Sequence, residues 1–116
     1  MKIMIVDDHA SMRKLIKTIV LFSCKEVVEC IEYENGEDAV ANYMTVKPDY
    51  ILMDVEMGKM SGFEATKLIL KQNNKAKIVI VTGNDARLSR ENAKKVGAIG
   101  FVSKDNLSGI KEYLKF

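Results

Sequence analysis

Three aspartates directly follow two short apolar runs of this sequence. Residues 3–6 (IMIV) lead into Asp7 and Asp8, and residues 50–53 (YILM) lead into Asp54. Apolar runs of this length, bounded by a charge, are typical of strands that are buried on both faces of a parallel sheet. Because ligands bind at the carboxyl ends of such strands, we interpret the three aspartates as candidates for chemistry rather than for packing.

Three carboxylates at one edge would repel one another unless a cation lay among them. Two unit charges about 4 Å apart repel by roughly 4 kcal/mol at an effective dielectric constant of about 20. A hard divalent cation such as Mg²⁺ meets this need, because it prefers carboxylates, a carbonyl, waters and a phosphate oxygen. Lys104 follows another predicted strand and supplies a second positive charge. A metal, a lysine and a free carboxylate suit phosphoryl transfer, with Asp54 as the nucleophile.

Predicted strands and helices alternate along the chain. The continuous apolar strands predict an α/β fold, a doubly wound five-stranded parallel sheet of flavodoxin-like order 2-1-3-4-5 with five helices. In this order the first and third strands are neighbours, so Asp7, Asp8 and Asp54 converge, and Thr82 and Lys104 end the next two strands. The predicted strands are 3–6, 27–31, 50–54, 78–81 and 100–102, and the predicted helices are 9–22, 36–45, one from residue 62 that ends at 72–74, 88–96 and 107–114.

The spacing of apolar residues predicts which helix faces are buried. The inward stripe of helix 9–22, which Arg13 flanks, consists of Met12, Leu15, Ile16, Ile19 and Val20. The inward set of helix 88–96 is thin and consists mainly of Leu88, Ala93 and Val96. We therefore expect helix 88–96 to be the least firmly anchored of the five.

Length and composition favour one globular domain over residues 1–116. The formal charge is only +2, so no strong field favours nucleic acid or a membrane surface. The first apolar run begins too early for a secretory signal, and no run reaches the roughly 18 residues of a membrane span, so we expect a cytoplasmic protein. Cys24 and Cys30 lack the neighbouring ligands of a zinc site, and we expect two reduced thiols.

With these residues in place, the chain resembles the response-regulator receiver domains of two-component signalling over its whole length. The resemblance rests on the acidic pair after residues 5–6, on Asp54 within residues 52–55, on Thr82-Gly83, and on the stretch GAIGFVSK at residues 97–104. Each motif alone is weak, whereas their order, each at a predicted strand end, is specific. The resemblance implies a single receiver domain of the chemotaxis-like type.

The resemblance also implies how the phosphoryl group is received. Asp54 would accept it from the phosphohistidine of a sensor histidine kinase or a phosphotransfer protein. Asp8, Asp54 and the backbone carbonyl of Glu56 would hold Mg²⁺, and Asp7 would act mostly through water. Lys104 resembles the lysine that clamps the phosphoryl group in this family.

A switch is implied by two further residues. Thr82 resembles the hydroxyl that moves to bond the phosphoryl oxygen, and Phe101 resembles the aromatic residue that turns inward behind it. The fourth helix, the fifth strand and the fifth helix would then form the surface that binds a downstream protein target.

The sequence departs from the usual family pattern at three positions. Gly58 stands where a proline is common, so the loop after Asp54 should be more flexible. Asp105 follows Lys104 where proline is again common, and a cis bond before a residue other than proline costs about 2.5–4 kcal/mol, which favours a trans bond. Glu56 adds negative charge at the rim of the site, and we predict that it alters the lifetime of the phosphoryl group.

Alternative interpretations of these residues stay open. Thr82 could only cap a loop, Phe101 could be plain core, Lys104 could be a surface lysine, and His9 is expected to be a partly exposed rim residue. We interpret the chain as an interaction switch and not an enzyme, beyond its own phosphorylation and dephosphorylation, with no direct binding to nucleic acid or membrane. The alternatives are a receiver cut from a longer DNA-binding response regulator, a small Mg²⁺-dependent aspartyl-phosphate phosphohydrolase, and a flavin-binding module of similar fold.

Overall fold

The computed structural model describes residues 1–24, 26, 28–83 and 86–114. Within these ranges strands and helices alternate as predicted, and no helix is long and apolar enough to cross a membrane. The strands are β1 (Lys2–Val6), β2 (Glu29–Tyr33), β3 (Tyr50–Met53), β4 (Ile78–Thr82) and β5 (Gly100–Ser103). The helices are α1 (Ala10–Ser23), α2 (Gly36–Val46), α3 (Gly62–Gln72), α4 (Ala86–Val96) and the 3-10 helix η1 (Leu107–Glu112).

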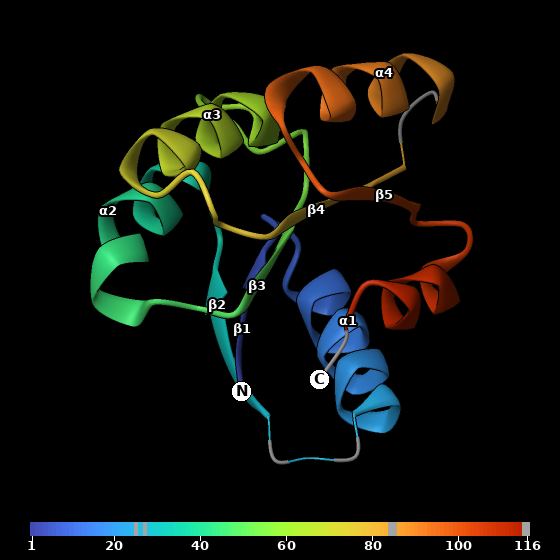
Figure 1. Cartoon of the computed structure of the whole chain (residues 1–116). Coiled ribbons are helices and arrows are strands. Elements are labelled where there is room, and N and C mark those ends of the chain that lie inside the picture. Colours follow the sequence, from blue (N-terminus) through green and yellow to red (C-terminus); the bar gives the residue numbers. More distant parts are fainter. Residues whose placement is uncertain (25, 27, 84–85, 115–116) are drawn as a thin grey trace.

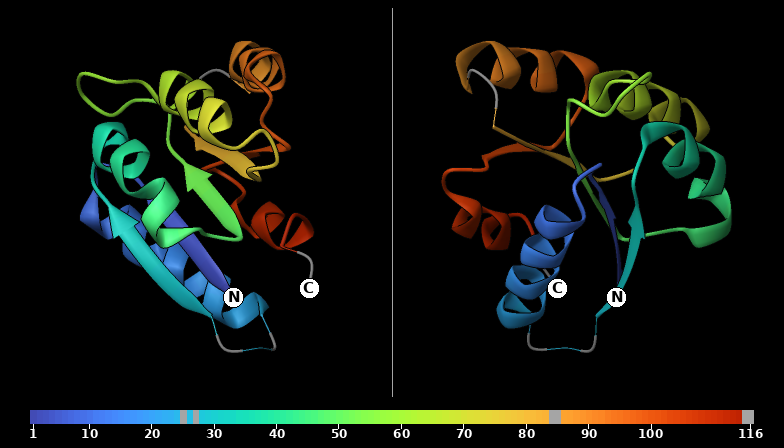
Figure 2. Two further views of the ribbon diagram at one scale, coloured as in Figure 1. Left: turned by 60° about the vertical axis from the view of Figure 1, so that its left-hand side comes forward. Right: turned by 180° about the vertical axis from the view of Figure 1, so that it is seen from behind.

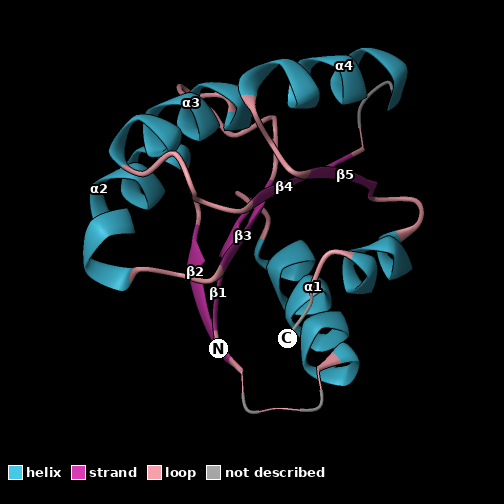
Figure 3. Cartoon of the chain, viewed as in Figure 1, coloured by secondary structure: helices cyan, strands magenta, loops and turns pink. Residues whose placement is uncertain are grey.

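The strands form one parallel sheet in the order β2-β1-β3-β4-β5, which confirms the predicted topology. Figures 1 and 3 show α1 and η1 together on one side of the sheet and α2, α3 and α4 on the other, and the turned views in Figure 2 agree. Val6 of β1 lies opposite Met53 of β3. The residues that follow them, Asp7 and Asp54, therefore leave the sheet side by side.

Alternate residues of the strands supply two separate core clusters. Ile3 and Ile5 belong to the cluster that includes α1 and η1, whereas Met4 and Val6 belong to the cluster that includes α2, α3 and α4. Because both faces are covered, every residue of β3 and β4 is buried. Each fully buried aliphatic side chain contributes about 1.5–3 kcal/mol, so the central strands are the rigid part of the fold.

Two residues predicted to face inward are exposed instead. Leu15 is 47% exposed and Leu88 is 62% exposed. The buried positions are Ile16 and Val20 in α1, and Ser89 and Ala93 in α4. Each buried pair is four residues apart and shares a helix face, whereas Leu15 and Leu88 lie five residues before the second member, about 140° around the axis. Among its described side chains α4 buries only small ones, which agrees with the expected weak anchoring.

The second strand and the last helix differ from their predicted bounds. β2 begins at Glu29, two residues later than predicted, and Val27 lies outside the described residues. As an edge strand β2 is only partly buried, so pairing with β1 sets its position and the apolar residues before it do not. The last helix is a short 3-10 helix. Its three residues per turn place Leu107 and Ile110 one above the other, and both are buried in the core.

Cys24 and Cys30 are both free thiols, as expected. Both are partly buried and pack against the core cluster beneath α1. Burial raises the pKa of each thiol above its usual value, because the thiolate is poorly solvated there. Neither cysteine therefore has the lowered pKa of a reactive nucleophile.

The first turn of α3 lies directly against the strand end that carries Asp54. Ser61 caps the helix by accepting a hydrogen bond from the Glu64 amide at 3.1 Å, and the Gly62 amide donates to the Val55 carbonyl at 2.8 Å. A Cβ atom on Gly62 would clash with the carbonyl oxygen of Asp54. Glycine is required here because only a residue without Cβ lets the helix approach that backbone so closely.

We expect Gly62→Ala to lower the free energy of unfolding by about 1–3 kcal/mol, the usual cost of overpacking, because the clash is with backbone atoms that cannot swing aside. Urea denaturation followed by circular dichroism measures this change. Gly109→Ala is the matched control, since a Cβ there meets only Val102 at 3.7 Å, an ordinary contact, and its effect should stay within about 0.5 kcal/mol. Equal effects of the two substitutions would contradict this account of Gly62.

Candidate functional site

The three predicted aspartates lie at the carboxyl edge of the sheet but differ in exposure. The side chains of Asp7 and Asp54 are 0% and 4% exposed, whereas that of Asp8 is 40% exposed. The Asp54 amide donates to the Val6 carbonyl at 2.9 Å, which continues the β1–β3 pairing past the strand end. Two carboxylates buried side by side need a positive partner, because an unpaired buried charge is costly.

The ammonium of Lys104 is that partner. Its Nζ lies 2.9 Å from Asp7 Oδ2 and 3.1 Å from Asp54 Oδ1. Lys104 directly follows β5, and its amide donates to the Thr82 carbonyl at 3.0 Å, which joins the ends of β5 and β4. The Lys104 side chain is only 17% exposed, so salt screens these ion pairs little. Residues from three strand ends thus meet around one charge, as the predicted strand order requires.

The protonation of the site reflects this crowding. Burial raises the pKa of Asp54, the charge of Asp7 raises it further, and attraction to Lys104 only partly opposes the two. Burial on its own would lower the pKa of Lys104, but its bonds and attraction to Asp7 and Asp54 outweigh burial and raise that pKa. Lys104 is therefore charged at neutral pH, and its one ammonium is shared between two carboxyl groups.

The acidic edge has the donor set for a further cation. One oxygen each of Asp7 and Asp8 and a ring nitrogen of His9 lie within 4.8 Å of one another, and Asp54 lies outside this group of three. Asp7 Oδ2 is buried, and the partner that the structure gives it among the described residues is the Lys104 ammonium at 2.9 Å. Carboxylate oxygens with spare acceptor capacity beside a solvent-exposed Asp8 fit a hard divalent cation such as Mg²⁺.

A hollow of about 290 Å³ opens beside Asp54. It is lined by His9, Asp54, Glu56, Thr82, Gly83 and Lys104. His9 lies at its rim with a side chain 69% exposed and Nδ1 2.9 Å from Asp8 Oδ1, which confirms the expected rim position. Thr82 ends β4 and is 2% exposed, so its place at the end of the fourth strand is also as predicted.

Phe101 lies in the core and does not line this hollow. It is 8% exposed and belongs to the cluster beneath α4, and the guanidinium carbon of Arg90 lies 5.2 Å from its ring centroid. Phe101 therefore points inward in this structure. The Arg90 contact couples α4 to β5 through a cation–π interaction.

The loop after Asp54 follows a path that glycine makes possible. Gly58 has φ = +69°, in the left-handed region, whereas a proline is fixed near −65° and cannot adopt it. Val55 and Met57 are buried on either side of the exposed Glu56, so the loop is anchored to the core next to the site. The Lys104–Asp105 bond is trans, as expected.

Arg13 belongs to the site, although its sequence position predicts only the flank of a helix. Its Nη1 donates to the backbone carbonyl of Asp7 at 2.7 Å, and its Nε donates to Glu32 Oε1 at 3.1 Å. Its side chain is 17% exposed. Side chains of a helix lean towards its N-terminus, so an arginine in the first turn after an acidic pair could have been recognised as able to reach back to that pair.

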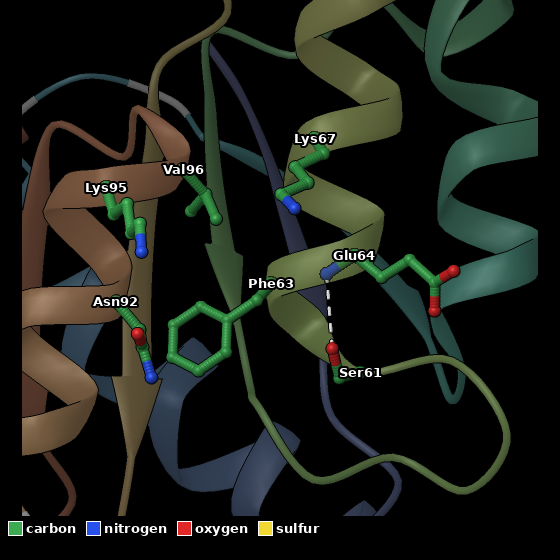
Figure 4. A pocket seen from close by; sticks show the side chains of 7 residues that line it. All are labelled: Ser61, Phe63, Glu64, Lys67, Asn92, Lys95 and Val96. Carbon is green, nitrogen blue, oxygen red and sulfur yellow. Dashed lines mark hydrogen bonds between the residues drawn. The ribbon is translucent and has the colours of Figure 1, made fainter.

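A second hollow, of about 610 Å³, lies between α3 and α4 (Figure 4). Its lining residues are Ser61, Phe63, Glu64, Lys67, Asn92, Lys95 and Val96. In Figure 4 the Phe63 ring reaches towards α4, while the Glu64 carboxylate points away from the hollow. None of these residues is a predicted site residue, so the smaller hollow beside Asp54 is the better candidate for chemistry.

Comparison with known proteins identifies this arrangement. The family model of the response regulator receiver domain matches residues 3–115. The chain is 39% identical to the chemotaxis protein CheY of Listeria monocytogenes over 90% of this chain and 86% of that protein. It is 36% identical to the transcriptional regulatory protein YdfI of Bacillus subtilis over 92% of this chain but 49% of that protein. The structure of chemotaxis protein CheY4 of Vibrio cholerae superposes with a TM-score of 0.83 at 26% identity, covering 97% of this chain and 98% of that one.

The raised pKa of Asp54 predicts that Asp54→Asn stabilises the protein at neutral pH. A carboxyl group whose pKa is higher in the folded state than in the unfolded state holds its proton more tightly when the protein is folded. The free energy of unfolding therefore falls as the pH rises from the unfolded-state pKa to the folded-state pKa, and it stays lower at higher pH. Asparagine removes this penalty, and we expect the Tm to rise by a few degrees at pH 7. The gain should vanish below about pH 4, where the unfolded carboxyl is also protonated.

Thermal unfolding, followed by circular dichroism, measures this gain. The pH should run from about 3 to about 8, which reaches from below the ordinary carboxyl pKa to above neutrality. Asp105→Asn is the control, because Asp105 is exposed and its replacement should change the Tm little at any of these pH values. A Tm of Asp54→Asn that falls below wild type at pH 7 would contradict the prediction.

Proposed function

Because the chain belongs to the response regulator receiver domain family, and is a CheY-like signalling protein rather than a catalyst, we propose that residues 1–116 act as a single receiver phosphorylated on Asp54. The phosphoryl donor is the phosphohistidine of a sensor histidine kinase or of a phosphotransfer protein. The observation that carries the proposal is the Lys104 ammonium shared by the buried carboxylates of Asp7 and Asp54, beside an open hollow that Asp54 and Lys104 line.

In the proposed transfer an oxygen of Asp54 attacks the phosphorus atom. The P–N bond to the donor imidazole breaks, and its electron pair stays on the ring nitrogen. Bound Mg²⁺, held by Asp8, Asp54 and the Glu56 carbonyl with Asp7 acting through water, would neutralise negative charge on the phosphoryl oxygens. Lys104 already lies 3.1 Å from an Asp54 oxygen, so its ammonium can pair with a phosphoryl oxygen after little movement.

The proposed switch begins at Thr82, whose hydroxyl donates to a phosphoryl oxygen. Thr82 lines the same hollow as Asp54 and is bonded through its carbonyl to Lys104, so it is placed to respond to the new group. We propose that the inward position of Phe101 seen in this structure is the one that the switch favours, and that α4 moves with it. Among its described side chains α4 buries only small ones, so it is the least costly helix to move. The surface formed by α4, β5 and η1 is the proposed binding site for a downstream protein target.

Glu56 is proposed to adjust how long the phosphoryl group survives. It is exposed at the rim of the hollow and two residues from Asp54. A carboxylate at that position can meet a water molecule that approaches the phosphorus atom.

We propose a cytoplasmic location for the protein, as its sequence predicts, and no direct contact with nucleic acid or membrane.

A second candidate function is a receiver that works within a longer DNA-binding response regulator. The similarity to YdfI, which spans about half of that transcriptional regulatory protein, favours this candidate. The chemistry at Asp54 would be the same in both cases, and only the target of the α4–β5–η1 surface would differ. The alternative from a different functional class is an enzyme, a small Mg²⁺-dependent phosphohydrolase. Multiple turnover of a phosphate monoester is the test for it.

We expect wild-type protein to take up label from a small radioactive acyl phosphate in the presence of Mg²⁺, and Asp54→Asn to take up none. The asparagine amide is not a nucleophile for this transfer, and the Lys104 and Asp8 side chains are left in place. Denaturing gel electrophoresis and autoradiography measure the label. Chelation with EDTA should abolish labelling of the wild type, because the crowded carboxylates then lack their neutralising ion.

Asp105→Asn is the matched control and should label as the wild type does, because Asp105 is exposed and forms no part of the hollow. Equal labelling of wild type and Asp54→Asn would overturn the assignment of the nucleophile. Steady multiple turnover of a phosphate monoester would instead favour the phosphohydrolase.

A further inference from the structure

We propose that Arg13 is a positioning residue that fixes the acidic pair for metal binding. This inference rests on the proposed function, because it assigns the arginine to the same Mg²⁺ site. Arg13 touches neither the proposed metal position nor Asp54 among the contacts described above. It acts through the backbone between Asp7 and Asp8.

Arg13 is held by hydrogen bonds at its backbone and at its guanidinium. Its amide donates to the His9 carbonyl at 3.0 Å in the first turn of α1. Its guanidinium then spans two elements, with Nη1 donating to the Asp7 carbonyl at 2.7 Å and Nε donating to Glu32 of β2 at 3.1 Å. A planar guanidinium with two bonds in fixed directions orders its partners more strongly than a single ammonium could.

The Asp7 carbonyl is the atom that decides where Asp8 points. It belongs to the peptide plane that joins Asp7 to Asp8, so holding this oxygen fixes the rotation of that plane. The Asp7 amide is already bonded to the Tyr33 carbonyl at 3.1 Å, and Asp7 Oδ1 accepts the His9 amide at 2.8 Å. The Arg13 bond completes this set. Without it the peptide plane loses the restraint on its carbonyl oxygen, and the 40%-exposed Asp8 carboxylate is left with the contact between its Oδ1 and the exposed His9 Nδ1 at 2.9 Å.

The charge of Arg13 and its geometry have opposite effects on a bound cation. A positive guanidinium near the acidic edge repels Mg²⁺, so removing its charge alone should tighten binding. Removing a group that orients metal ligands typically weakens affinity by about 10–100-fold. The sign of the change therefore separates a positioning role from an electrostatic one.

We expect Arg13→Ala to weaken Mg²⁺ binding by the unphosphorylated full chain at least about 10-fold, measured by isothermal titration calorimetry with MgCl₂. Arg13→Lys keeps the charge but can make only one of the two hydrogen bonds. Its Mg²⁺ affinity should therefore lie between those of the wild type and Arg13→Ala. Lys14→Ala is the matched control, because it removes one charge from the neighbouring exposed position of α1 and should leave affinity unchanged or slightly tighter.

A metal-free measurement keeps the inference testable if calorimetry is affected by global destabilisation. Hydrogen exchange of the His9 amide, which donates to Asp7 Oδ1, should quicken in Arg13→Ala relative to core amides of β3 but not in Lys14→Ala. Unchanged or tighter Mg²⁺ binding by Arg13→Ala would overturn the inference while leaving the receiver function intact. Absence of Mg²⁺ binding by the wild type would overturn the proposed metal site and this inference with it, whereas absence of label on Asp54 would overturn the receiver function.

Discussion

The ion pairs from one lysine ammonium to two buried aspartates hold this site together. Asp7 and Asp54 are nearly inaccessible to solvent, and Lys104 is the cation that contacts both. Loss of the Lys104 charge would leave both buried carboxylates without compensation, and removing such a partner from a buried ion pair typically costs about 3–5 kcal/mol. The end of β5 is therefore tied to the ends of β1 and β3 by charge as well as by the sheet that joins them.

The rest of the fold explains why charge gathers at this edge. Both faces of the sheet are covered, and β3 and β4 are built of buried residues that are apolar as far as Thr82 at the end of β4, so the middle of the sheet offers no charged partner for a carboxylate. The carboxylates that belong to the central strands therefore lie where the strands end and the loops begin. Parallel pairing brings several such ends together. Asp7, Asp54, Thr82 and Lys104 all owe their proximity to this one rule.

The topology and the place of the main site residues could be predicted because both depend on continuous patterns in the sequence. Buried strands read as continuous apolar runs, and a residue that follows such a run must lie at the sheet edge. Arg13 follows no apolar run. Its role depends on two contacts across the fold, one of them to a backbone carbonyl, and its only signal in the sequence is its place one helical turn after the acidic pair. The exposed Leu15 and Leu88 were misplaced because neighbouring residues on a helix can compete for the buried face, and packing decides between them. The edge strand β2 began later than its apolar run because pairing with β1 set its position.

The loop after Asp54 is closed at its base in a way that bears on how this protein can change. The Gly62 amide bonds the Val55 carbonyl, and Val55 and Met57 are buried, while Gly58 and Lys59 at the tip are exposed. Substitutions or insertions at the tip are absorbed above this closure and do not reach the backbone of Asp54. The surroundings of Asp54 can therefore be changed while its backbone stays in place.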